Sequence, residues 1–156
     1  MKQNVRESDA WGADVHYVSH TNASAAGNAK GCRPMYYTYS KEGKKLGEIM
    51  VKHRRQIYPG TVQLNASTKW YELRVPKAVS YYEEHVFHDN LEDATWFHTH
   101  MKEIAENAAK GLCEYFGIPY VEKTKPAEPL EPMTPGELLV KIMNSAGTCG
   151  TWELVK

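Results

Sequence analysis

The sequence has no excess of charge of either sign. Nineteen Lys and Arg residues balance nineteen Asp and Glu residues among 156, so the formal net charge is zero. Proteins that bind nucleic acid through a broad phosphate-neutralising face need clustered positive charge, so we expect no nucleic-acid partner. No apolar run approaches the roughly 18 residues of a membrane-spanning helix, and no charged stub followed by an apolar stretch opens the chain. We therefore expect no membrane partner, and synthesis in the cytoplasm without a signal peptide.

Cysteine is also scarce. The three cysteines, Cys32, Cys113 and Cys149, lie far apart and form no CxxC pair. This spacing argues against a cysteine-based zinc site, and the odd number indicates reduced thiols in a cytoplasm. Cys113 lies within a helical pattern, so we expect it to be a small core residue.

Histidines and aromatic residues are the unusual part of the composition. The chain has 4 Trp, 10 Tyr and 3 Phe, and 42% of its residues are hydrophobic, which is enough for a buried core. Histidine can be a metal ligand, a general base or a surface residue, so its positions show where a site could lie. The seven histidines are His16, His20, His53, His85, His88, His98 and His100.

Hydrophobic periodicity predicts strands that alternate with helices. Such an order indicates an α/β domain with a twisted, mostly parallel sheet flanked by helices. Ser40 is the expected N-cap of the first long helix, Pro59-Gly60 ends it, and Gly117 ends the second. The segment 61–75 is ambiguous. The predicted strands are 14–19, 34–39 and 78–83, the predicted long helices are 41–58 and 91–116, residues 2–12 read weakly as a helix, and 21–33 form a loop.

A change of composition near residue 121 marks the end of the domain. Prolines recur at every third position from Pro126 to Pro135, a spacing that favours an extended polyproline II linker. About twenty residues remain after it, too few to build a core alone. We therefore expect an α/β domain over 1–121, a linker over 122–135, and a short tail or the start of a further module over 136–156.

Dense polar groups follow two of the predicted strands, as SHTNAS from Ser19 and as EEHVFHDN from Glu83. In α/β folds, functional groups collect just beyond the carboxyl ends of strands. A zinc hydrolase needs imidazoles to hold the metal and a free carboxylate to take and give protons. Two other interpretations remain open: His20 as a loop-ordering residue, and Glu83-Glu84 as a complement to the dipole of the next helix.

The other histidines give weaker signals. His98 and His100 are two residues apart on a helix, so they point to different faces and cannot bind one metal together. We expect both to be surface residues. His53 lies on the apolar stripe of its helix and is expected to pack there, and His16, within a strand, is expected to be structural. Asp89-Asn90 precedes the helix 91–116 and is expected to cap it.

Several motifs in unbroken order carry a family resemblance. The segment 14–23, DVHYVSHTNA, is followed by MYYTY at 35–39, by PKAVSYYEEHVFHDN at 76–90, by EDA at 92–94 and by GLCEYFGI at 111–118. Together they resemble the zinc-dependent N-acetylmuramoyl-L-alanine amidases of autolysins, phage endolysins and sporulation, over about residues 5–121. The Glu-x-x-Phe-His-Asp-Asn version looks like the clostridial endolysin and sporulation branch.

The resemblance implies a peptidoglycan hydrolase. Its family binds one zinc through two histidines and a glutamate, and a second glutamate activates the zinc-bound water that attacks the amide between the lactyl group and L-alanine. His20 matches the second zinc histidine and Glu84 matches the catalytic glutamate. Glu83 competes for that role, but it is one position out of register and would face the other side of a strand. Asn22 and Asn90 match positions that shape the cleft, and no substrate-binding residue is assigned.

The chain departs from the family at its beginning. The motif DPGHGG, with the first zinc histidine, and the following helix, with the zinc glutamate, are both absent. A zinc site needs three or more protein ligands, and nothing in the pattern makes His85 or His88 a substitute. The sheet would also lack its first strand, which leaves backbone groups and apolar surface in need of a partner.

Three interpretations follow from this departure. The chain could be a truncated amidase that is inactive alone, one piece of a split protein whose missing segment or second copy is supplied separately, or a non-catalytic domain that still binds peptidoglycan. A carbohydrate- or peptide-binding module lined by Trp and Tyr is a further alternative. We expect an amidase-type domain that uses zinc and acts on peptidoglycan at the bacterial cell wall.

Overall fold

The computed structural model describes residues 2–122. The predicted linker lies outside the described residues except for Glu122, and the predicted tail lies wholly outside them, so both stay predictions. The elements follow in the order α1 (Lys2–Trp11), β1 (Val15–Asn22), β2 (Arg33–Tyr37), α2 (Lys41–Ile57), β3 (Asn65–Ser67), α3 (Tyr71–Arg74), β4 (Val79–Phe87), α4 (Leu91–Thr99) and α5 (Met101–Phe116). No helix in this part of the chain is long and apolar enough to cross a membrane.

The four strands form one sheet in the order β1-β4-β2-β3. Strand β1 pairs with β4 in parallel and β2 pairs with β3 in parallel, which confirms a mostly parallel sheet. The central pair of β2 and β4 is antiparallel. Its direction follows from the connection between β1 and β2, which contains no helix, whereas parallel neighbours usually need a helical crossover.

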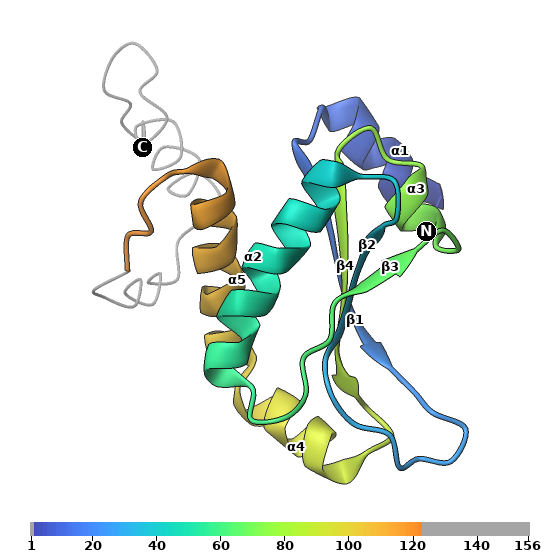
Figure 1. The fold of residues 1–156 in the computed structure, drawn as a ribbon, viewed down its shortest axis with the longest axis vertical. Helices are drawn as coiled ribbons and strands as arrows, with labels where there is room; N and C mark the ends of the chain where they lie inside the picture. Colours follow the sequence, from blue (N-terminus) through green and yellow to red (C-terminus); the bar gives the residue numbers. More distant parts are fainter. Residues whose placement is uncertain (1, 123–156) are drawn as a thin grey trace, which may run out of the picture. The chain divides into compact units, whose positions relative to one another are not determined.

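Two helices cover one face of the sheet, as Figure 1 shows for α2 and α5. Ser40 starts α2 as predicted, because its hydroxyl accepts a hydrogen bond from the N–H of Gly43 at 2.9 Å. Gly111 allows α5 to approach α2 closely, since a Cβ there would lie 2.5 Å from the sulfur of Met50. The core on this face forms two clusters: Leu46, Met50, Tyr81 and Ala108, and then Cys32, Val51, Tyr58, Val62 and Val86.

The short helices α1 and α3 lie on the other face of the sheet, at the amino ends of β1 and β4. Val5 of α1 and Leu73 of α3 are buried, and His16 of β1 is buried as well. The expectation that His16 is a structural strand residue agrees with this burial. The segment 61–75, which was ambiguous in the sequence, contains β3 and α3.

Three predicted boundaries were wrong. Strand β1 runs to Asn22 rather than ending at residue 19, so His20 lies within the strand. Strand β4 runs to Phe87 rather than ending at residue 83, because all residues from Ser80 to Phe87 are buried and the last of them pairs with β1. The predicted helix 91–116 is two helices that break at His100. There the His100 ring and the Thr99 hydroxyl both bond to the Trp96 carbonyl oxygen, at 2.8 and 3.1 Å, and compete with the regular helical pattern.

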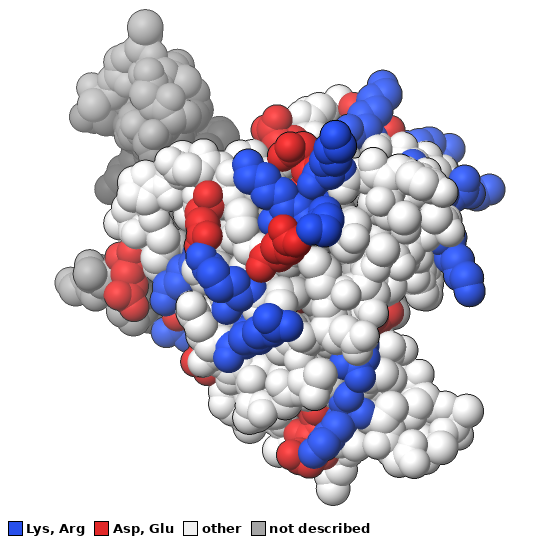
Figure 2. Space-filling model, in the orientation of Figure 1, with Lys and Arg blue, Asp and Glu red and all other residues white. Residues whose placement is uncertain are grey.

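Two smaller expectations also change. Cys113 is half-buried rather than a core residue, and His100 is half-buried rather than a surface residue. His98 is exposed as predicted, and His53 is half-buried. On the face drawn in Figure 2, basic and acidic side chains are interspersed rather than gathered by sign.

Candidate functional site

His20 and Glu84 lie side by side on the face of the sheet opposite to α2 and α5. They are register partners in β1 and β4, and His20 Nδ1 lies 3.3 Å from Glu84 Oε2. The His20 side chain is 59% exposed, whereas that of Glu84 is 6% exposed. The two residues singled out in the sequence are therefore brought together from strands that are more than sixty positions apart.

The geometry of His20 leaves one ring nitrogen available. Its Nδ1 lies 3.0 Å from the carbonyl oxygen of Thr21, which can only accept a hydrogen bond. In this arrangement Nδ1 carries the proton and Nε2 presents a lone pair, which is the state that binds a metal ion. His20 is thus suited to be one metal ligand.

Glu83 faces the opposite side of the sheet, as its register predicts. Its carboxylate accepts hydrogen bonds from Arg54 Nε at 2.9 Å and from the Tyr17 hydroxyl at 2.6 Å. Burial alone would raise the pKa of Glu83, but the Arg54 guanidinium outweighs it and the pKa lies below its ordinary value. Both side chains of this ion pair are 1% exposed. Glu83 is therefore a structural anion and does not compete with Glu84.

His85 belongs to the same buried network. Arg54 can only donate, so its Nη2 donates to His85 Nδ1 at 3.0 Å. The proton of a neutral imidazole then sits on Nε2, which donates to the Ser19 hydroxyl at 2.8 Å. Burial lowers the pKa of His85 and keeps the ring neutral. His85 therefore neither activates Ser19 as a base nor replaces the missing zinc histidine.

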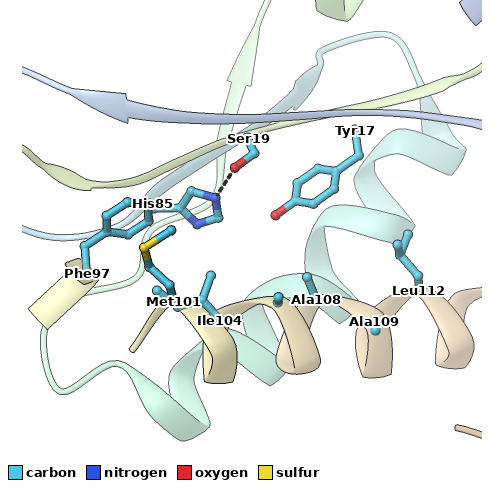
Figure 3. A pocket seen from close by; sticks show the side chains of 10 residues that line it. Tyr17, Ser19, His85, Phe97, Met101, Ile104, Ala108, Ala109 and Leu112 are labelled. Atoms are coloured by element: carbon cyan, nitrogen blue, oxygen red, sulfur yellow. Dashed lines mark hydrogen bonds between the residues drawn. The ribbon is translucent and has the colours of Figure 1, made fainter. Parts of the chain in front are cut away.

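An apolar pocket of about 420 Å³ lies beside this network, between β1 and α5 (Figure 3). Tyr17, Ser19 and His85 point into it from the sheet, and the small and apolar side chains of α5 line the other wall. A second pocket of about 430 Å³ continues from Tyr17 and Leu112 along β1. We call the two together the β1–α5 groove. It runs along β1, which is an outer strand of the described sheet.

The loops that follow β1 and β4 hold each other. His88 Nδ1 lies 3.0 Å from the Thr21 hydroxyl, and the Asp89 carboxylate accepts from the Ser24 N–H at 2.7 Å. Asn90 caps α4 as predicted, by accepting from the N–H of Asp93 at 3.2 Å. Asn22 stays with the backbone, because its side chain accepts from the N–H of Ala23. These residues order the rim of the site.

Asp93 has an anchoring role that the sequence reading missed. Its buried carboxylate accepts from the Gly31 N–H at 2.9 Å, from the Phe87 N–H at 3.0 Å and from the Tyr58 hydroxyl at 2.6 Å. It thereby ties the start of β2 to the end of β4. Its place three positions after the N-cap Asn90 indicates a helix start, but nothing in the local sequence indicates its contacts with Gly31 and Phe87.

The described residues do not form a complete zinc site. No group of three or more His, Cys, Asp or Glu side chains between residues 2 and 122 is placed to hold a metal ion. A catalytic zinc needs three protein ligands, and in the described chain only His20 is placed as one beside Glu84. The described residues therefore fit such a site only in part, because they supply one of the three protein ligands.

The comparisons with known proteins found similarity in three dimensions only. No model of a known protein family matches the sequence, and no curated protein is significantly similar to it. Among solved structures, the catalytic domain of the CD27L endolysin, which targets Clostridia difficile, is 22% identical with a TM-score of 0.64, over 72% of this chain and 61% of that one.

Two further solved structures match to a similar extent. The CwlD amidase of Clostridioides difficile, in complex with the GerS lipoprotein, is 17% identical, with a TM-score of 0.69, over 74% of this chain and 61% of that one. The catalytic domain of CwlV, an N-acetylmuramoyl-L-alanine amidase of Bacillus (Paenibacillus) polymyxa var. colistinus, is 21% identical, with a TM-score of 0.68, over 76% and 66%. The chain spans about three fifths of the first two. It therefore has the fold of the catalytic domains of N-acetylmuramoyl-L-alanine amidases.

Proposed function

We propose that this chain is a peptidoglycan amidase domain that acts at the bacterial cell wall on the amide between the N-acetylmuramoyl lactyl group and L-alanine. The observation that carries the proposal is the contact between His20 and Glu84 on the exposed face of an amidase-like sheet. The fold alone does not specify a reaction, so the proposal depends on this pair.

Glu84 is the acid–base group of the proposed reaction. Its carboxylate would take a proton from the attacking water and return it to the amine of L-alanine as the amide breaks. Strand β4 lies between β1 and β2, which holds Glu84 in place without a flexible loop. His20 would hold a zinc ion through Nε2, and a bound zinc would polarise the amide and its attacking water.

The remaining zinc ligands must come from outside the described residues. The outer edge of β1 and the β1–α5 groove offer a place for the polypeptide that supplies them, because a strand can add to the edge while apolar side chains fill the groove. The solved amidase domains contain a further part that this chain does not cover. Another segment of the protein or a second copy could fill this place.

The incomplete metal site is also compatible with one alternative function. A domain that lost its zinc ligands could retain the substrate-facing surface and bind peptidoglycan without cleaving it. The two functions differ in one outcome, because the amidase releases free amino groups of L-alanine from cell walls and the binding domain does not.

The test is hydrolysis of purified cell walls by the full chain with added zinc. We expect free N-terminal alanine to appear, and Glu84→Gln to reduce its rate by about 10²–10⁴-fold, the range of a lost acid–base group. Glu92→Gln is the matched control, since Glu92 is exposed and pairs with Lys30 at 2.9 Å. If the protein co-sediments with cell walls but releases no alanine, the proposal of an amidase is wrong and that of a peptidoglycan-binding domain takes its place. Neither release nor co-sedimentation would refute both.

A further inference from the structure

Three charged or metal-binding side chains form a row across the face that carries His20 and Glu84. His20 of β1 and Arg33 of β2 are both register partners of Glu84, one on each side of it. Residues directly opposite each other in paired strands project to the same face. Glu84 is therefore flanked by a histidine on one side and by a guanidinium on the other.

An aromatic pair lies one step along β4 from this row. Tyr82 is two residues before Glu84, so it projects to the same face. Trp70 stacks on it with ring centroids 5.3 Å apart and an interplanar angle of 28°, and the His20 ring centroid lies 5.7 Å from that of Tyr82. Trp70 is 38% exposed, whereas Tyr82 is buried. The buried Tyr82 ring thus supports the accessible Trp70 indole and holds it in a fixed orientation.

Trp70 lies at the edge of the part of this face that is covered by a helix. It is the N-cap residue of α3, the helix that packs over the amino end of β4. A rigid aromatic surface beside Glu84 is suited to the apolar face of a sugar ring.

Arg33 offers a different kind of recognition. Its guanidinium lies 5.9 Å from the centre of the Phe87 ring and donates to the carbonyl oxygens of Cys32 and Lys30 at 3.3 and 3.5 Å. Within residues 2–122 it makes no ion pair with a carboxylate. A planar guanidinium held in this way can bind a carboxylate through two parallel hydrogen bonds.

We infer that the peptidoglycan substrate lies across this face in one direction, with a sugar ring on Trp70 and a carboxylate of the stem peptide at Arg33. The inference rests on the proposed function, because it places the scissile amide at Glu84, between the two contacts. The order of the contacts follows from the strand: Tyr82, on which Trp70 stacks, lies two residues before Glu84 on β4, and Phe87, over which the Arg33 guanidinium lies, follows Glu84 by three residues.

Arg33 has a simpler explanation that the test must separate. As a neighbour of Glu84 it could merely offset the charge of that carboxylate. In that case its removal would change the binding of all ligands by a similar factor. Recognition of a substrate carboxylate instead requires that the effect vanish when that carboxylate is converted to an amide.

The test is a binding titration with four small ligands, in chelator so that no hydrolysis occurs. N-acetylmuramoyl-L-alanyl-D-glutamate carries both features, its α,γ-diamide keeps the ring but has no carboxylate, and the two corresponding sugar-free dipeptides lack the ring. We expect Trp70→Ala to weaken both sugar-bearing ligands by about 2–10-fold and to leave the dipeptides unchanged. We expect Arg33→Gln to weaken the carboxylate forms by about tenfold or more and to leave the amides unchanged.

Four further variants keep the result interpretable. Trp70→Phe and Arg33→Lys should fold as the parent does and show partial losses of the same selectivity. Tyr39→Ala and Arg6→Gln remove an exposed aromatic ring and an exposed guanidinium that lie outside the candidate site and the groove, and should change nothing.

Equal losses for all four ligands, or no loss, would overturn the inference while leaving the amidase proposal standing. No binding of any of the four ligands by the parent protein would overturn the inference as well. In that case alanine release from whole cell walls decides separately on the amidase.

Discussion

The buried ion pair of Arg54 and Glu83 allows the most quantitative test of the structure. Both side chains are 1% exposed, and Arg54 also supports His85 through Nδ1. Replacing Arg54 by leucine leaves a buried carboxylate without its cation. Breaking a buried pair from one side costs about 3–5 kcal/mol of unfolding free energy, so we expect a loss of this size at pH 7.

The loss should depend on pH, and its sign follows from proton binding. In the parent, the pKa of Glu83 is lowered on folding, so the pair stabilises the fold above the ordinary pKa of the carboxyl and this stabilisation is lost as pH falls below it. In Arg54→Leu the folded state regains neutrality by taking up a proton, on Glu83 or on His85, whose Nδ1 lies 3.7 Å from the carboxylate. The loss of unfolding free energy relative to the parent should therefore be smaller at pH 5.5 than at pH 7.5, by up to about 1.4 kcal/mol per pH unit.

The measurement is urea unfolding of parent and variant at several pH values, followed by tryptophan fluorescence. The double variant Arg54→Leu with Glu83→Gln removes both charges and should recover a large part of the loss, because a neutral replacement of a buried pair is often tolerated. A loss below 1 kcal/mol, or one that is constant from pH 5.5 to 7.5, would show that the pair is not buried and coupled as described.

Two further predictions concern stability. Asp93→Ala should lower the unfolding free energy by about 3 kcal/mol, because hydrogen bonds to a buried carboxylate are worth about 1.5–3 kcal/mol each and Tyr58 would lose its acceptor. Asp89→Ala, which removes an exposed carboxylate, is the control. Equal effects of the two variants in urea unfolding would contradict the anchoring role of Asp93. Burial lowers the pKa of both His16 and His85, so the unfolded chain binds protons more readily and stability should fall as pH drops through the ordinary histidine range near 6.5; a parent protein equally stable at pH 5.5 and 7.5 would contradict this.

The sequence singled out His20 and Glu84 through a family resemblance that rests on short local motifs. Glu84 was preferred to Glu83 because it fits the motif spacing to Phe87 and Asn90, and strand alternation predicted that Glu83 would face the other way; the structure places the two carboxylates on opposite faces. The helix limits at Ser40 and Gly117 were likewise predicted by residues that act within one turn, a hydroxyl that caps and a glycine at φ 67°.

The features that were missed depend on contacts between distant parts of the chain. Nothing near Asp93 in the sequence shows that it anchors Gly31 and Phe87, and nothing near Trp70 shows that it stacks on Tyr82. The end of β4 was missed because Glu83 and Glu84 read as a polar strand end. Their burial depends on Arg54 in one case and on neighbouring strands in the other, which periodicity cannot show.

An irregularity in β4 explains why Glu84 and Phe87 can serve one surface. They are three positions apart, and in a regular strand this spacing would put them on opposite faces. His20 pairs with Glu84, but Asn22 pairs with Phe87, so β4 contains one extra residue between the two pairs. The bulge turns His85 and Val86 to the helix side, where both are buried, and returns Phe87 to the side of Glu84, beneath Arg33. The Glu-x-x-Phe spacing thus reflects this bulge. Because of the bulge, the buried network of His85 lies on one face of the sheet, while Glu84 and Phe87 lie together on the other face, at the candidate site.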